Sequence, residues 1–385
     1  MRTPKILALL LTLSLVTTPH IAVAQTIEQS IQQGQSAMEA EKYSEAETAW
    51  RQAIKLNPKY LPAYIGLGIA LDEQNRYTEA IAVYRQALKI DPKYAPAYYY
   101  LGIALYNTEQ YKQAETAYNQ ALQLGYKYAQ VYDRLGDALY AQEQLEKAIA
   151  AYRQAIKTDS KYAPAYVGLG NALDDLKRSD EALAAYRQAI KIDPKYAYAY
   201  YHFGIALSNA EKYNEAEDAY RQAIELGYEY APVYNQLGKV LYYQDKLEDA
   251  ETAYNQAIKL DPKYAPAYVG LGNIEDDQNK LDSAIANYRQ AIKLDNKYPL
   301  AYYLLGLVLH KQDQLSEAIA NYRQAIQLGL KYASVYTVLG LALHQQGNLA
   351  EAISNYQQAL AIDPNYEKAQ SGLKEAQQQL TSKSK

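Results

Sequence analysis

The chain has 385 residues, no cysteine and a formal net charge of -4 at pH 7. The lack of cysteine excludes a disulfide framework and a cysteine-ligated metal site, and the small acidic excess argues against nucleic acid or anionic lipid as the main partner. The composition contains 43 tyrosines against one phenylalanine and one tryptophan, which calls for a structural explanation.

The N-terminus has the pattern of a secretory signal peptide. Arg2 and Lys5 precede an apolar run over residues 6–16, and small residues at 22 and 24 end the segment. The run is shorter than the ~20 residues that a membrane-spanning helix needs. We therefore predict that residues 1–24 are removed, with an uncleaved membrane anchor as the alternative. No later segment is apolar enough to cross a bilayer, so we expect no membrane insertion of the mature chain and an exported location: a bacterial periplasm, an equivalent lumen or the extracellular medium.

After this segment a tyrosine recurs every 34 residues. The series is Tyr60, Tyr94, Tyr128, Tyr162, Tyr196, Tyr230, Tyr264, Tyr298, Tyr332 and Tyr366. A fixed period of this length is typical of stacked repeats, in which each unit packs on its neighbours. Within residues 61–94 apolar residues follow helical spacing twice, around Leu67 and around Tyr84. Each unit is therefore predicted to be two amphipathic helices.

Proline and glycine occupy fixed places in these units. Pro92 stands where the second helix should end, and Pro96 stands in the first turn of the next helix, where a missing N–H costs little. A glycine such as Gly68 lies in the middle of every first helix, although it costs ~1 kcal/mol there relative to alanine. We expect that this glycine allows close approach of the second helix through the small residue twelve positions later, Ala80.

These aromatic, Leu-Gly, alanine and proline positions resemble the tetratricopeptide repeat. Ten such units fit residues 27–366, and three of their rows account for 28 of the 43 tyrosines. The resemblance implies an all-α fold, a right-handed superhelical solenoid of helix-turn-helix units. Beyond it we expect a capping helix over residues 367–380 and a disordered tail over 381–385.

A second period of 102 residues spans three units. VGLGNALDD at 167–175 returns as VGLGNIEDD at 269–277, and a glycine replaces the junction proline at Gly125, Gly227 and Gly329. Such glycines can end a helix as readily as proline can. Two explanations stay open: duplication of a three-unit block, or a partner with its own regular spacing.

In the resembling family the first helix of each unit lines a concave groove. The positions that this pattern selects include Tyr99, Tyr106, Asp133, Asp137, Tyr140, Asn171, Asp174, Asp175, Tyr201, Asn235, Lys239, Tyr242, Tyr243, Asn273, Asp276, Asp277, Tyr303 and His310. This predicted lining is aromatic and acidic. Its acidic pairs at 72–73, 174–175 and 276–277 lie near helix C-termini, where the helix dipole disfavours negative charge. They fit a solvated turn, a groove that selects neutral to basic protein segments, or calcium, although no calcium-loop spacing is present.

The sequence contains no catalytic constellation. His202, His310 and His344 lack metal-pair spacing, and the repeated GLG lies inside a helix, unlike a phosphate-binding loop. We expect no enzyme activity, no metal and no cofactor. The expected function is a non-enzymatic protein-protein interaction scaffold that binds extended or helical partner segments in its groove, for assembly of an envelope or membrane-associated complex. An exported polysaccharide-binding solenoid and a self-associating structural spacer are the alternatives, and the oligomeric state stays open.

Overall fold

The computed structural model describes residues 21–383, and all regular structure in this range is helical, which confirms the all-α prediction. The predicted signal peptide lies outside the described residues, apart from residues 21–24, which belong to the first helix. The helices are α1 (Ile21–Glu39), α2 (Tyr43–Leu56), α3 (Leu61–Asp72), α4 (Tyr77–Ile90), α5 (Ala95–Asn107), α6 (Tyr111–Gln123), α7 (Ala129–Tyr140), α8 (Leu145–Thr158), α9 (Ala163–Asp175), α10 (Ser179–Ile192), α11 (Ala197–Asn209), α12 (Tyr213–Glu225), α13 (Ala231–Tyr243), α14 (Leu247–Leu260), α15 (Ala265–Asp277), α16 (Leu281–Leu294), α17 (Pro299–Lys311), α18 (Leu315–Gln327), α19 (Ala333–Gln345), α20 (Leu349–Ile362) and α21 (Glu367–Lys383). We call the odd-numbered helices A helices and the even-numbered ones B helices.

Each A helix joins the following B helix through a tight turn that contains one residue in the left-handed backbone region. Asn75 has a φ of 59° and Lys177 one of 62°, and equivalent residues recur every 34 positions. In the turn of Asn75 the N–H of Arg76 donates to the carbonyl of Leu71 at 2.9 Å, which satisfies a free carbonyl at the end of α3. Most of these residues carry a side chain despite a cost of roughly 1–2 kcal/mol for this conformation; only Gly347, at φ 86°, avoids that cost. The turns make consecutive A and B helices a hairpin.

The glycine in the middle of each A helix packs against an aromatic ring of the B helix. A Cβ on Gly136 would lie 2.5 Å from Cε1 of Tyr152, and one on Gly68 would lie 2.1 Å from Cε1 of Tyr84. Real Cβ atoms essentially never approach other atoms so closely, so a larger residue would force the buried ring to shift. The predicted neighbour twelve positions later, Ala80, was therefore wrong, because the residue that requires the glycine is the buried aromatic sixteen positions later.

A second glycine contacts the same ring from the following hairpin every 102 residues. A Cβ on Gly168 would lie 2.4 Å from Cε1 of Tyr152, and Gly270 stands in the same relation to Tyr254. The GLG sequence thus accommodates two rings: its first glycine faces the buried aromatic ring of the preceding hairpin, which is Trp50 for Gly66, and its second faces the tyrosine of its own hairpin.

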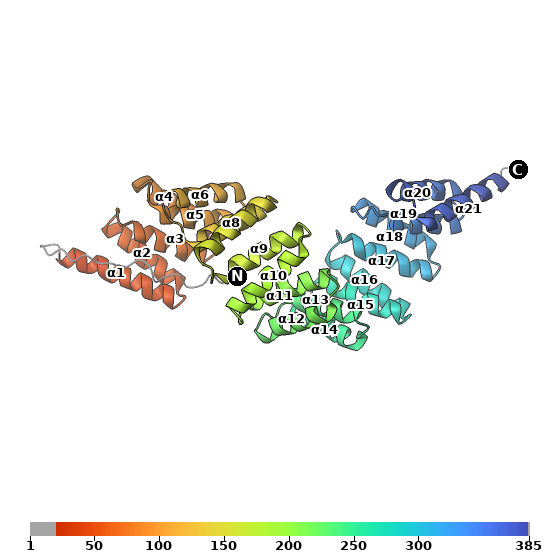
Figure 1. The fold of residues 1–385 in the computed structure, drawn as a ribbon, viewed down its shortest axis with the longest axis horizontal. Coiled ribbons are helices and arrows are strands. Elements are labelled where there is room, and N and C mark those ends of the chain that lie inside the picture. Colours follow the sequence, from red (N-terminus) through yellow and green to blue (C-terminus); the bar gives the residue numbers. More distant parts are fainter. Residues whose placement is uncertain (1–20, 384–385) are drawn as a thin grey trace. The chain divides into compact units, whose positions relative to one another are not determined.

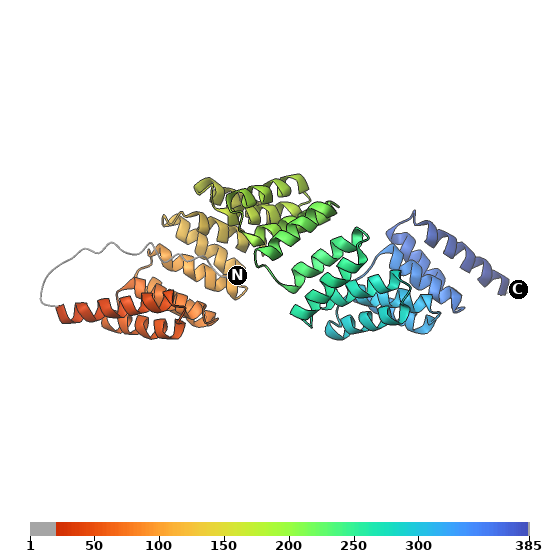
Figure 2. The same cartoon turned by 90° about the horizontal axis from the view of Figure 1, so that it is seen from below.

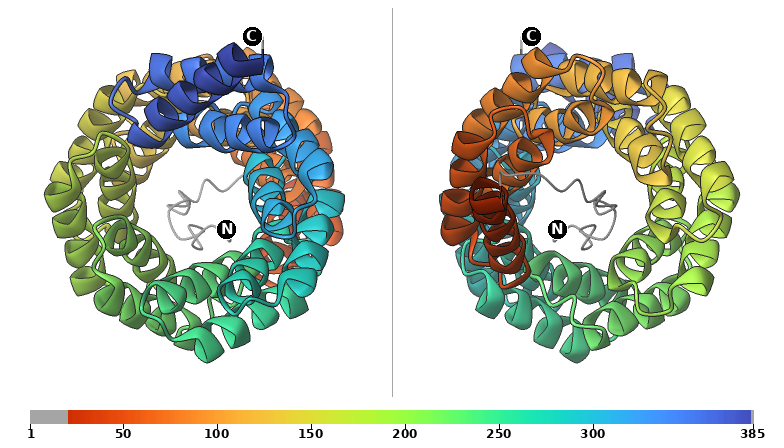
Figure 3. Two further views of the ribbon diagram at one scale, coloured as in Figure 1. Left: turned by 90° about the vertical axis from the view of Figure 1, so that its right-hand side faces the viewer. Right: turned by 90° about the vertical axis from the view of Figure 1, so that its left-hand side faces the viewer.

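The contacts between helices divide the chain into two compact units, with the boundary in sequence between Pro194 and Lys195. Unit 1 contains α1 to α10, and unit 2 contains α11 to α21 (Figures 1 and 2). Within each unit the hairpins stack so that A and B helices form two curved layers (Figure 3). A helices such as α3, α5 and α7 contact one another directly, whereas successive B helices of the described chain have no comparable contacts. The A layer therefore lies on the inner side of each curve.

Glycine ends three B helices, as the sequence predicts. Gly125, Gly227 and Gly329 have φ values of 91°, 87° and 103°. After α6 the N–H of Tyr126 donates to the carbonyl of Ala121 at 3.0 Å, and the N–H of Gly125 donates to that of Leu122 at 3.1 Å. This pair of bonds is the Schellman arrangement that caps helix C-termini.

The helix α21 covers the last hairpin. Ala369 and Ala376 are fully buried, and Gly372 leaves space for the ring of Tyr356, as an A helix of a following hairpin would. Lys374 stands where such a helix would carry the glycine that faces its own B helix. The structure extends this predicted capping helix to Lys383, three residues beyond the expected end and into the segment expected to be disordered.

Candidate functional site: the inner face of the A helices

The site residues predicted from the sequence differ widely in exposure. Tyr99 and Asp133 are only 7% and 4% exposed, so neither can contact a partner, and for these two the prediction of an exposed groove residue was wrong. Asp175 and Asp277 are exposed. The half-buried members are Tyr106, Asp137, Tyr140, Asn171, Asp174, Tyr201, Asn235, Tyr242, Asn273, Asp276, Tyr303 and His310.

Several half-buried members hold the hydroxyl of a B-helix tyrosine. The hydroxyl of Tyr186 donates to Oδ1 of Asn171 at 2.7 Å, and Tyr288 donates to Asn273 at 2.8 Å in the same geometry. Tyr152 likewise donates to Asp137 at 2.9 Å. A buried hydroxyl without a partner would be destabilising by about 1–3 kcal/mol. These inner-face residues therefore complete the core of their own hairpin.

The acidic pairs bond to the neighbouring A helix. Tyr140 on α7 donates to Asp175 on α9 at 2.6 Å, and Tyr242 on α13 donates to Asp277 on α15 in the same way. Nζ of Lys311 on α17 lies 2.6 Å from Oδ1 of Asp276. These contacts join residues 35 positions apart and connect successive A helices. The acidic pairs at 174–175 and 276–277 therefore do more than keep a turn solvated, which was one interpretation of the sequence.

The first acidic pair, Asp72 and Glu73, differs from the other two because Asp72 has a largely buried carboxyl group. Asp72 accepts a hydrogen bond from the hydroxyl of Tyr84 at 2.8 Å, and its other carboxylate oxygen is buried without a partner. Burial raises the pKa of Asp72 to about 7, the bond from Tyr84 opposes that rise, and neighbouring Glu73 adds to it. The carboxyl of Asp72 therefore changes its protonation near neutral pH.

A buried polar cluster surrounds Asp133 on α7. The hydroxyl of Tyr162 lies 3.3 Å from its carboxylate, and Arg134 forms an ion pair of 2.8 Å with Asp137. Burial, together with the charge of Asp137, raises the pKa of Asp133 well above its ordinary value and favours the protonated form. Tyr99 belongs to the same cluster, and burial raises its pKa to about 12.

The remaining predicted aromatic residues mostly pack against other rings. Tyr201 lies 5.4 Å from Tyr228 and Tyr303 lies 6.3 Å from Tyr322, measured between ring centroids. Tyr106 meets Tyr111 at 5.3 Å, edge to face. His310 makes a polar contact of 2.7 Å with Gln345 on the next A helix.

Side chains that are free to meet a partner are concentrated in unit 2. Tyr243 and Leu341 on the A helices are 52% and 42% exposed, and Nζ of Lys239 lies 5.9 Å from the centre of the Tyr243 ring. Sequence reasoning missed Leu341, although it occupies the same place in its hairpin as Asn171. In unit 1 the inner face instead carries the carboxylates Asp174 and Asp175.

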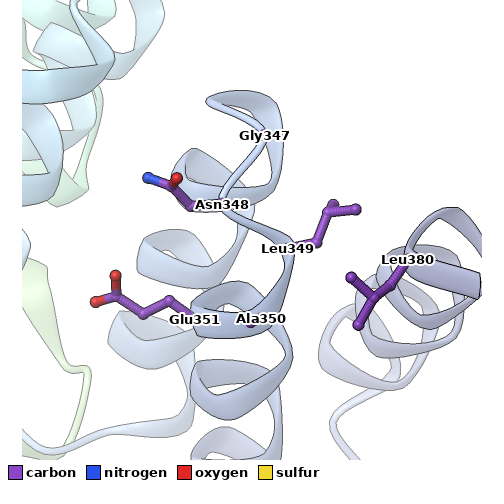
Figure 4. A pocket seen from close by; sticks show the side chains of 6 residues that line it. All are labelled: Gly347, Asn348, Leu349, Ala350, Glu351 and Leu380. Atoms are coloured by element: carbon purple, nitrogen blue, oxygen red, sulfur yellow. The ribbon is translucent and has the colours of Figure 1, made fainter. Parts of the chain in front are cut away.

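Two shallow notches lie at equivalent positions of two hairpins, each at the turn between an A helix and its B helix. One is lined by Gly347, Asn348, Leu349, Ala350, Glu351 and Leu380 (Figure 4). The other is lined by residues 41–45 and Gln74, which are the equivalent positions in the first hairpin. Gln74 bridges its notch by a bond of 3.1 Å to Glu47, whereas Leu380 faces Leu349 across the other one. Both notches belong to the packing between neighbouring hairpins.

Two further features of the described residues concern function. No group of three or more histidine, aspartate or glutamate side chains within residues 26–382 is placed to hold a metal ion. Between residues 21 and 383 no helix combines the length and the apolar character that crossing a membrane requires.

Comparisons with known proteins identify what the hairpins are similar to. Models described as tetratricopeptide repeat match residues 31–95, 73–135, 134–197, 185–218 and 299–365, and a model described as TPR repeat matches residues 238–275 and 272–313. The matches together span most of the chain. The search of curated proteins found no match.

Solved structures show the same arrangement of helices. The APC/C hetero-tetramer Cut9–Hcn1 is similar with a TM-score of 0.52 at 14% identity, over 91% of this chain and 96% of that one. Yeast Tom70 is similar with a TM-score of 0.50 at 16% identity, over 94% and 96%. YrrB, described as a TPR protein with an unusual peptide-binding site, has a TM-score of 0.40 at 26% identity, over 52% and 98%. At these identities the first two likenesses concern the fold alone.

Proposed function

The chain belongs to the tetratricopeptide-repeat proteins, and we propose that it is a non-enzymatic scaffold that binds a segment of a partner protein along the inner face of its A helices. In this proposal α1 to α20 make up ten repeats, and α21 caps the last of them. The partner segment is extended or helical and neutral to basic. Binding of this kind would serve assembly of an envelope or membrane-associated complex.

The proposal depends mainly on one observation. Some inner-face side chains form bonds to neighbouring helices, whereas others are exposed to solvent. Asp276 and Asp277 on α15 bond to the neighbouring A helices, whereas Leu341 on α19 and Tyr243 on α13 are 42% and 52% exposed. One face of the Tyr243 ring stacks on Tyr213 at 5.1 Å. Large apolar side chains on a rigid support act as anchors in protein interfaces. Unit 2 therefore supplies the apolar anchors.

Charge supports the choice of partner. In unit 1 the inner face carries the half-buried Asp174 and the exposed Asp175, and the cation Arg134 on α7 is paired with Asp137. In unit 2 Lys311 neutralises Asp276. Complementary charge governs association rate and specificity more than affinity. A neutral to basic segment fits the acidic inner face of unit 1.

The export part of the proposal depends on residues 1–24, whose charge and apolar pattern fit a secretory leader. Expression in a bacterial host followed by intact-mass measurement tests it. A mature chain that begins at Gln25 in the periplasmic fraction supports export, and a full-length chain in the cytoplasm contradicts it.

The binding part is tested by affinity capture from envelope extract. We expect the parent to retain a partner that the double variant Tyr243→Ala, Leu341→Ala loses by at least tenfold. The matched control is Gln154→Ala, Asn255→Ala, which alters exposed residues of the B helices α8 and α14. Equal retention by both variants would contradict binding on the inner face.

A further inference from the structure

The tyrosine that precedes each A helix is exposed at three junctions and packed at the others. Tyr128, Tyr230 and Tyr332 are 44%, 58% and 64% exposed, while the equivalent tyrosines of the other junctions are half-buried. The three stand 102 residues apart, and each follows one of the glycine turns. The 102-residue period of the sequence therefore places one exposed tyrosine at every third junction between hairpins.

The backbone explains the exposure. At proline-type junctions the tyrosine before the A helix has a ψ of 81° to 92°. After the glycine turns, ψ is 153° at Tyr128, 150° at Tyr230 and 152° at Tyr332. The glycine at positive φ sends the chain along another path, and the extended residue after it turns its ring toward solvent. All three junctions therefore share one backbone geometry, in which a glycine at positive φ precedes an exposed tyrosine.

Two of these rings are supported from behind. Tyr128 meets the edge of Tyr126 at 4.7 Å, and Tyr230 meets Tyr228 at 4.8 Å. Tyr126 in turn packs on Tyr99 at 5.7 Å. A ring held in this way loses little conformational freedom when a ligand binds. In the third junction Leu330 takes the place of the supporting tyrosine.

The three sites share an aromatic ring but no charge. The residue before the exposed tyrosine is Lys127, Glu229 or Lys331, and all three are exposed. A ligand that used charge would meet opposite signs at successive sites. The feature common to all three is a flat amphipathic surface with a hydroxyl at its edge. A ligand recognised in the same way at all three sites would therefore be uncharged.

We infer that Tyr128, Tyr230 and Tyr332 are stacking sites for a neutral polysaccharide. The apolar face of a sugar ring matches a tyrosine ring, and sugar hydroxyls can bond to the phenol hydroxyl. A stable protein interface normally buries about 1,200 Å² or more around an apolar core, whereas each of these rings has a charged residue as its immediate neighbour. Within unit 2 the two sites stand three hairpins apart, and a glycan chain long enough to engage both would gain from multivalency.

The test uses a panel of neutral and acidic oligosaccharides of increasing length, with the purified chain and binding measured on an array and by affinity electrophoresis in neutral glucan gels. We expect binding to neutral glycans that strengthens with chain length. The variant Tyr128→Ala, Tyr230→Ala, Tyr332→Ala should lose at least tenfold in affinity. Tyr243→Ala, which removes an equally exposed tyrosine from the inner face, should bind as the parent does.

Several outcomes would overturn this assignment: retention of glycan by the triple variant, binding confined to acidic glycans, equal affinity for short and long chains, or no binding to any neutral glycan. Circular dichroism of the triple variant checks folding, and single variants replace it should it unfold. Because the inner face is unchanged in the triple variant, capture of a protein partner distinguishes a failure here from a failure of the scaffold proposal.

Discussion

Single residues decide how closely the helices pack. The buried tyrosine of a B helix contacts the backbone of its own A helix through a glycine, and its hydroxyl often bonds to an inner-face side chain such as Asn171. The core and the candidate site therefore share residues. A substitution on the inner face can consequently alter stability as well as binding, and controls must separate the two effects.

The substitution Gly136→Ala tests the packing of ring on glycine. At an open helical position this change stabilises by about 1 kcal/mol, but here the new Cβ would lie 2.5 Å from the ring of Tyr152, which is 2% exposed. We expect a net destabilisation of about 1–3 kcal/mol from overpacking, measured by hydrogen exchange of α7 and α8. A stabilised variant would refute the steric role of the ring.

The substitution Asp72→Asn tests the buried carboxyl. The pKa of Asp72 is raised to about 7 in the folded state, above its value in an unfolded chain, so the folded state holds the proton more tightly. The free energy of unfolding should then fall as pH rises from about 4 to 7, by up to about 1.4 kcal/mol per pH unit.

Asparagine keeps an acceptor for Tyr84 and removes the charge. We therefore expect the variant to protect α3 and α4 from hydrogen exchange better than the parent at pH 8, and equally well at pH 4. Identical pH profiles for the two proteins would contradict the assignment.

At the scale of elements, neighbouring hairpins are joined by partly buried carboxylates. Glu217 on α12 accepts from Nζ of Lys246 at 2.8 Å and from Gln244 at 3.0 Å, both just after α13. Burial alone would raise the pKa of Glu217, but the bonds from Lys246, Gln244 and Arg221 lower it below its ordinary value. The contribution of Glu217 to stability is therefore present above the unfolded pKa and is lost as pH falls through the lower folded one.

The substitution Glu217→Ala measures this connection. We expect a loss of about 1–2 kcal/mol in local stability, seen as faster hydrogen exchange in α12 to α14 at pH 7. The difference from the parent should shrink as pH falls through the lowered pKa of Glu217. Glu251 occupies the same position in the next hairpin and is exposed, so Glu251→Ala should change exchange little. Equal effects of both substitutions would show that the bridging bonds contribute nothing.

The sequence predicts the elements well because their signals are local. Helical spacing, prolines in first turns and the 34-residue period place α3 and α4 within residues 61–94. Contacts between hairpins do not depend on local signals alone. The ion pair of Lys311 with Asp276 depends on the rotation of one A helix relative to the next. That rotation depends on the packing of whole hairpins, so the bracing of the acidic pairs could not be predicted.

At the scale of the whole molecule, the family pattern correctly identified the helices that form the inner layer but not which of their side chains are free. Tyr99 fits the lining pattern and yet is buried beside Tyr126, because a glycine turn brings that ring over it. Leu341 fits the same pattern and is exposed. The exposed tyrosines at the glycine turns lie outside the pattern altogether, and only the backbone geometry shows them.

The central claim is that a partner segment binds along the inner face, and site-specific photo-crosslinking tests it most directly. The photoreactive p-benzoyl-phenylalanine is placed singly at Tyr243 and Leu341 on the inner face, and at Gln154 and Asn255 on the B helices. In native envelopes we predict one shared crosslinked protein from both inner positions and none from the two outer positions. Crosslinks of equal yield from the outer positions, or none from the inner ones, would contradict the account.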